Sequence, residues 1–156
     1  SFKVAIVRPP MVYGPHCPGN YALLRKLSRL TPLFPKVENR RSMVFIGNLV
    51  NFLEQIISHE DVGIFHPQDP QYIDTMNMVR KIASVHNKKI YSSTWGAKIL
   101  KFLLGRTKIY NKVFGDLYYQ QNLSFYRDNT YQIYNVEQAI NISEKEVIHK
   151  DNETTT

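Results

Sequence analysis

Cysteine is almost missing from this sequence: Cys17 is its only one in 156 residues. A lone cysteine cannot form a disulfide within the chain, and no cysteine and histidine cluster has the spacing of a zinc site. We therefore expect no metal and, as the default for such a chain, a reducing, cytoplasmic setting. His16 precedes Cys17, but adjacency along the chain does not create the hydrogen bond that activates a thiol.

Long apolar runs are missing as well. None approaches the ~18 residues that span a bilayer, and the N-terminal residues lack the pattern of a secretory signal. There is also no internal repeat or heptad run, which excludes solenoids and coiled coils. We expect a chain without a membrane partner.

Blocks of like charge are absent too, although the formal net charge is +7. The basic residues are scattered in ones and twos, a pattern typical of a solvated surface. A positive field also attracts phosphate-bearing ligands, either small nucleotides or nucleic acid. Charge alone does not choose between these ligands.

What the sequence does contain is 43% hydrophobic residues, enough for one domain or a large piece of one. Short β-rich runs alternate with segments of helical period, and Gly-Pro-rich loops separate them. Because strands and helices alternate, we expect an α/β fold with short parallel strands. The predicted strands are 3–7, 42–46, 62–66 and 89–92, and the predicted helices are about 20–30, 47–57, 75–85, 95–105 and 136–143.

Two stretches together resemble the extended short-chain dehydrogenase/reductase family. They are Val4-Ala5-Ile6-Val7-Arg8-Pro9-Pro10-Met11-Val12-Tyr13-Gly14-Pro15 and Arg41-Ser42-Met43-Val44-Phe45-Ile46-Gly47-Asn48-Leu49. Within that family they are most similar to UDP-glucose 4-epimerases and related capsular-polysaccharide epimerases and dehydratases. Weaker likeness continues at 113–117 and 131–140. The resemblance implies the C-terminal, substrate-binding part of a Rossmann-like fold.

The same resemblance implies a set of binding residues. In the family, the loop after the first strand passes under the nicotinamide ring of NAD, at the carboxyl edge of the sheet. Asn20 and Arg41 match the family's contacts with the diphosphate of a nucleotide sugar, and Phe34 matches a segment beside the uracil. The residues expected to border the cofactor are Pro9, Pro10, Met11 and Val12.

The sequence also departs from the family. Asn48 stands where the family usually has Asp, and we expect it still to cap the helix there. The family's later Arg-x-x-Asp pair has no clear match. No glycine-rich turn follows a first strand, and no Tyr-x-x-x-Lys supplies the general base and its neighbouring lysine. We therefore expect no catalytic residue in this chain, with both motifs lying upstream of Ser1.

These observations predict a UDP-sugar-binding half over residues 1–149, a flexible tail over 150–156 and an absent N-terminal NAD-binding half. Such a chain would be inactive by itself and would not bind NAD alone. The alternative is a non-catalytic RNA-binding or regulatory module of the same family, because aromatic side chains on a basic surface stack on bases. The strand at 3–7 would expose unpaired edges without its neighbours, so we also expect a homo-oligomer.

Overall fold

The computed structural model describes residues 2–96 and 114–153 and has an α/β fold, as the alternation predicted. Its strands are β1 (Ala5–Val7), β2 (Met11–Tyr13), β3 (Leu33–Pro35), β4 (Met43–Phe45), β5 (Gly63–Phe65) and β6 (Tyr91–Ser93). Its α-helices are α1 (Asn20–Leu30), α2 (Ile46–His59), α3 (Thr75–Val85) and α6 (Val136–Glu153), with short 3₁₀ turns η1 (Gln121–Ser124) and η2 (Arg127–Asn129).

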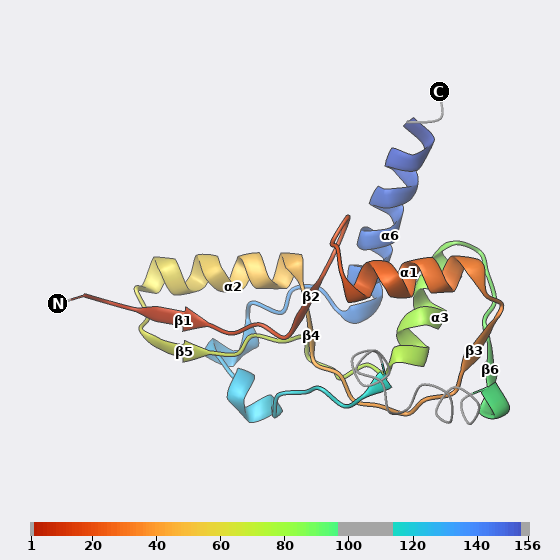
Figure 1. Cartoon of the computed structure of the whole chain (residues 1–156). Helices are drawn as coiled ribbons and strands as arrows, with labels where there is room; N and C mark the ends of the chain where they lie inside the picture. Colours follow the sequence, from red (N-terminus) through yellow and green to blue (C-terminus); the bar gives the residue numbers. More distant parts are fainter. Residues whose placement is uncertain (1, 97–113, 154–156) are drawn as a thin grey trace.

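The strands form three parallel pairs: β1 with β5, β2 with β4, and β3 with β6. Figure 1 shows β1 and β5 beside α2 at one end, and β3 and β6 with α1 and α3 at the other. The β2–β4 pair lies between these ends. Each crossover between parallel strands passes through a helix or a long loop, as parallel pairing requires.

Two apolar clusters fill the described structure. The larger joins α1, α3 and the first half of α6 to β2–β4, and the smaller is aromatic and lies between α2 and the β1–β5 pair. In the smaller cluster the Phe52 ring meets the rings of Phe65, Tyr126 and Tyr131 edge-on, at centroid distances of 5.9, 5.0 and 4.9 Å. These clusters fix the helices against the strands.

The helices α1, α2 and α3 lie close to their predicted ranges. Leu49, Phe52 and Ile56 are buried along α2, at the spacing that predicted its inner face. The carboxylate of Asp74 accepts a hydrogen bond from the Asn77 amide at 2.7 Å, so it caps α3.

Three predicted details are wrong. The loop expected after Pro10 contains β2, and the proline-flanked Leu33–Pro35 segment forms β3. Each of these strands has only three residues and forms because it pairs in parallel with a distant strand, β4 or β6. The helix predicted to end at Ser143 continues to Glu153. Most of the predicted helix at 95–105 lies outside the described residues.

The first strand is largely exposed on one face. Val4 and Ile6 are 51% and 43% exposed, although the strand pairs parallel with β5 as expected. In the described part of the chain, no helix is long and apolar enough to cross a membrane. Those residues also contain no cluster of three or more side chains that could hold a metal ion.

Candidate functional site

A cleft of about 220 Å³ opens where β1 ends and where β2 and β4 begin. Three of the four residues predicted to border a cofactor line it, while the fourth, Val12, lies inside β2 opposite Val44. The cleft therefore coincides with the loop that the family resemblance singled out. Its lining residues are Pro9, Pro10, Met11, Ser42, Leu117, Tyr118 and Tyr119.

The segment Leu117–Tyr119 forms one wall and is tied to the chain leading into β4. The Leu117 amide donates to the Arg40 carbonyl, and the Ser42 amide donates to the Leu117 carbonyl, both at 3.0 Å. The Tyr119 amide donates to the Ser42 hydroxyl oxygen at 2.9 Å. These bonds hold the wall in place by backbone contacts, and Ser42 uses its hydroxyl in them.

Tyr118 gives this wall an aromatic face. The Arg40 guanidinium lies 4.7 Å from the centre of its ring, and the Tyr72 ring meets it edge-on at 5.4 Å. Tyr118 remains 40% exposed, so a planar ligand can still reach it. An aromatic face beside a cation suits a ligand that joins a flat base to a phosphate.

Arg41 lies behind the cleft wall and is only 4% exposed. Its Nη1 donates to the Gly115 carbonyl at 3.1 Å, and its backbone bridges to Ile73 and Leu117. Burial lowers the pKa of Arg41 from its usual range, while the carboxylate of Asp116 opposes the shift. Arg41 is thus part of the fold and not a solvent-facing arginine; its contact with a diphosphate stays a prediction.

Phe34 is buried in β3, with its ring 6.0 Å from the Phe114 ring. Phe114 precedes Gly115, the residue that Arg41 contacts. The structure therefore brings Phe34 and Arg41 to the same two-residue segment. The predicted contact between Phe34 and a base remains a prediction.

Asn20 is the first residue of α1 and is half-buried. The N-cap position belongs to Gly19, whose φ of +87° suits glycine, and no side chain caps the helix. Helix N-terminal amides bind anions, which keeps the predicted diphosphate contact of Asn20 chemically reasonable.

Asp69 was not singled out from the sequence, yet it is 2% exposed and joins three elements. Its Oδ2 accepts from the Tyr13 hydroxyl at 2.8 Å, and its Oδ1 accepts from the Phe45 amide at 3.1 Å and from Asn48 Nδ2 at 2.8 Å. Burial raises the pKa of Asp69, while these three hydrogen bonds oppose the rise. The carboxylate fixes the end of β2 against the β4–α2 junction, next to the cleft loop.

The expectation that Asn48 caps its helix is wrong. The N-cap of α2 is Phe45, and Asn48 lies inside the helix with no exposure. Its Nδ2 donates to Asp69 and to the Tyr134 carbonyl, the latter at 2.9 Å, and its Oδ1 accepts from the Tyr134 amide at 2.9 Å. The side chain has to donate as well as accept there, and an ionised aspartate has no donor.

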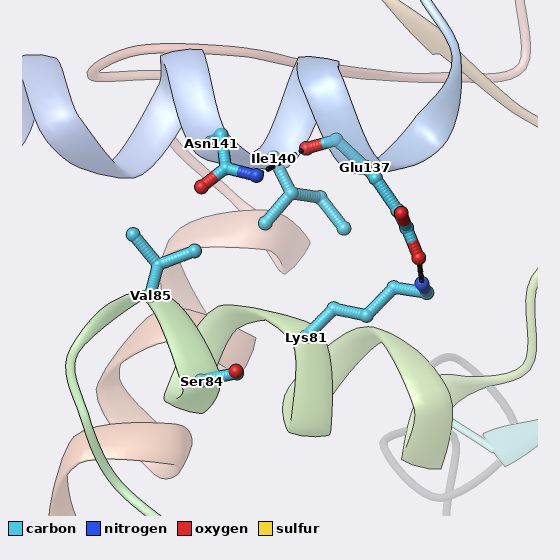
Figure 2. A pocket seen from close by; sticks show the side chains of 6 residues that line it. All are labelled: Lys81, Ser84, Val85, Glu137, Ile140 and Asn141. Carbon is cyan, nitrogen blue, oxygen red and sulfur yellow. Dashed lines mark hydrogen bonds and ion pairs between the residues drawn. The ribbon is translucent and has the colours of Figure 1, made fainter.

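A second hollow, of about 360 Å³, lies between α3 and α6 (Figure 2). Lys81 of α3 donates to the Glu137 carboxylate of α6 at 2.6 Å across it. None of the predicted cofactor- or substrate-binding residues lines this hollow. The cleft beside the first strand is therefore the candidate site.

Comparisons with known proteins bear on the family of the chain. No protein-family model matches the chain. A UDP-glucose 4-epimerase of Vibrio cholerae is 34% identical over 125 residues, which cover 75% of this chain and 38% of that protein. The chain thus spans well under half the length of this curated relative.

Solved structures share the fold. A human epimerase family protein with NADPH covers 92% of the chain and 48% of its own length, with a TM-score of 0.63 and 12% identity. A Thermus thermophilus UDP-glucose 4-epimerase in complex with NAD covers 92% and 46%, with a TM-score of 0.57 and 12% identity. These neighbours carry nicotinamide cofactors. Together with the curated relative, they show that this chain belongs to the NAD-dependent epimerase/dehydratase family of extended short-chain dehydrogenases/reductases.

Proposed function

We propose that the chain is the substrate-binding part of an NAD-dependent UDP-sugar 4-epimerase and is inactive by itself. The observation that carries the proposal is the 34% identity over 125 residues to a UDP-glucose 4-epimerase. A cytoplasmic location and a role in polysaccharide biosynthesis belong to the same proposal. The nucleotide sugar would be held by Asn20, Arg41 and Phe34.

The cleft fits one face of a nicotinamide ring. Pro9, Pro10 and Met11 offer apolar surface and no acid or base, so they can border the ring without reacting with it. When bound, NAD supplies the hydride acceptor. The cleft holds about 220 Å³, below the roughly 300–1,000 Å³ of complete ligand pockets, so this chain would supply only part of the cofactor site.

One face of the β1–β5 pair is apolar and exposed to solvent, which supports the proposal that a cofactor-binding region packs on it. We call this surface the bare face. Val7 and Phe65 pack under α2 with the aromatic cluster, whereas the opposite face carries an exposed apolar group. Parallel sheets are normally covered on both faces. We propose that the N-terminal, NAD-binding half of the family fold covers this face, or a second copy of the chain where that half is missing. The exposed group is Val4, Ile6, Val62 and Ile64, at 51, 43, 57 and 54% exposure.

Binding of UDP to the 156-residue chain, followed by calorimetry and amide NMR, tests the substrate proposal. We expect UDP to bind more tightly than ADP and to shift the amides of Asn20 and Arg41. Arg41→Lys keeps the charge but loses the planar fork and should weaken binding. Binding of RNA with strong salt dependence, and no response to UDP, would instead support the RNA-binding alternative.

A second experiment tests whether 4-epimerase activity requires a separate cofactor-binding part. The chain is mixed with the N-terminal, cofactor-binding part of the Vibrio cholerae epimerase. We expect no 4-epimerase activity on UDP-glucose from either part alone and activity from the mixture. Turnover by the 156-residue chain alone would contradict the proposal.

A further inference from the structure

Glu144 of α6 is a fully buried carboxylate outside the cleft. The Tyr21 hydroxyl donates to its Oε1 at 2.7 Å, and Arg25 Nε lies 3.0 Å from both of its oxygens. The His86 ring nitrogen Nε2 lies 2.9 Å from its Oε2. One carboxylate thus joins α6 to α1 and to His86, the residue that ends α3.

The first turn of α1 has little to fix it locally. Its N-cap is Gly19, no side chain caps it, and no acidic residue lies in its first turn. Tyr21 directly follows Asn20, so the Tyr21–Glu144 bond acts on the residue next to the predicted phosphate contact. The Tyr21 ring also lies 5.4 Å from the Tyr13 ring at the end of β2. The direction of this turn therefore depends on contacts from distant parts of the chain.

The opposite charges of Arg25 and Glu144 strengthen the contacts between α1 and α6. The side chain of Arg25 is 12% exposed, and its guanidinium lies 5.1 Å from the centre of the Tyr21 ring, so its counter-charge must come from nearby. Glu144 supplies that charge through a bond to Nε. Burial, followed by the Glu144 charge, raises the pKa of Tyr21 well above its usual range, so its hydroxyl keeps its proton and donates.

We propose that Glu144 is a positioning residue for the substrate site. Through Tyr21 and Arg25 it sets the direction of the first turn of α1, and thereby the placement of Asn20 and of the helix N-terminal amides for a diphosphate. The inference rests on the proposed function, because it assumes that Asn20 meets the diphosphate of a UDP-sugar.

Two variants of the 156-residue chain test it, with UDP as the probe. Glu144→Gln removes the charge, and Tyr21→Phe removes one hydroxyl while keeping the ring against Tyr13. Each variant weakens a hydrogen bond to a charged group, and only a part of that loss would reach the site. We expect the Kd for UDP to rise about tenfold in Glu144→Gln and about threefold in Tyr21→Phe.

Amide NMR separates positioning from general loss of structure. In both variants the UDP-induced shift at Asn20 should shrink, whereas the shift at Arg41, whose guanidinium donates to the Gly115 carbonyl, should persist. The matched control is Glu137→Gln, which removes the exposed Lys81–Glu137 ion pair between α3 and α6 (Figure 2) without touching α1. That control should bind UDP like the wild type.

The outcomes are distinguishable. If the wild-type chain does not bind UDP, the proposed function fails and this inference fails with it. If the wild type binds but Tyr21→Phe, still folded, binds equally with an unchanged Asn20 shift, the positioning role is refuted and UDP binding stands. Should Glu144→Gln fail to fold, Tyr21→Phe decides the question.

Discussion

Replacing Asn48 by Asp should destabilise the chain strongly at neutral pH. In the native structure Asn48 Nδ2 donates to the Asp69 carboxylate at 2.8 Å and to the Tyr134 carbonyl at 2.9 Å. An aspartate would place a carboxylate oxygen against two acceptors, one of them charged. Holding one carboxyl protonated at pH 7, about three units above its ordinary pKa, costs about 4 kcal/mol. That is a large share of the roughly 5–15 kcal/mol by which a domain is stable.

The destabilisation should depend on pH. In Asn48→Asp the folded carboxyl pair has a pKa above that of the unfolded chain, so the native state binds the extra proton. Stability therefore falls as the pH rises through the window from about 4 to 7, by at most about 1.4 kcal/mol per unit. Burial already raises the pKa of Asp69 in the wild type, which gives a weaker dependence of the same sign.

Urea unfolding followed by circular dichroism at pH 5 and pH 7 measures both effects. Asn51→Asp is the matched control: Asn51 lies in α2, is half-buried, and donates to the backbone carbonyls of Thr130 and Tyr131 at 3.4 and 3.2 Å. It should cost about 1 kcal/mol. In the double variant Asn48→Asp with Asp69→Asn, one buried carboxyl remains but the repulsion is gone, so the pH slope should fall to about that of the wild type. A single Asn48→Asp variant as stable as the wild type at pH 7 would refute the reasoning.

Three further predictions concern the fold and the bare face. Phe52→Ala should cost about 3–5 kcal/mol in urea unfolding because the ring is 1% exposed, whereas Leu53→Ala, at 37% exposure, should cost less than about 1; equal costs would contradict the aromatic cluster as a core. Asp74→Ala should cost about 1 kcal/mol through loss of the α3 cap, and no change would exclude that role. Ile6→Glu and Ile64→Glu should leave the unfolding midpoint of the isolated chain almost unchanged but abolish activity with the cofactor-binding part; retained activity would place the docking face elsewhere.

The helices were predictable because their signals are local. Along α2, apolar residues recur with helical period, and at the start of α3 an aspartate stands where a cap is needed. The two missed strands carry no such signal. Each has three residues beside proline or glycine, and each exists only because a distant strand pairs with it. Sequence patterns do not report such pairings.

The candidate site divides in the same way. The cleft loop at Pro9–Met11 was predictable, because a proline pair after an apolar strand marks a strand end and the family motif follows it. The other wall, Leu117–Tyr119, was not, because backbone bonds to the 40–42 segment place it there. The aromatic pair directly after the weaker family likeness at 113–117 was the one signal that could have indicated it.

The end of α6 shows why helix limits predicted from the spacing of apolar residues are wrong where polar residues occupy buried positions. The buried positions of this helix keep a regular spacing of three and four as far as Val147, but two of them are Ser143 and Glu144. The apolar period therefore stops where the helix does not, and the predicted end at Ser143 falls beside the residue that binds Tyr21 from 123 positions away. Local pattern and tertiary structure are expected to disagree at functional or strained sites. Here the disagreement and the proposed positioning role have one cause, a carboxylate in a core position that pairs with α1.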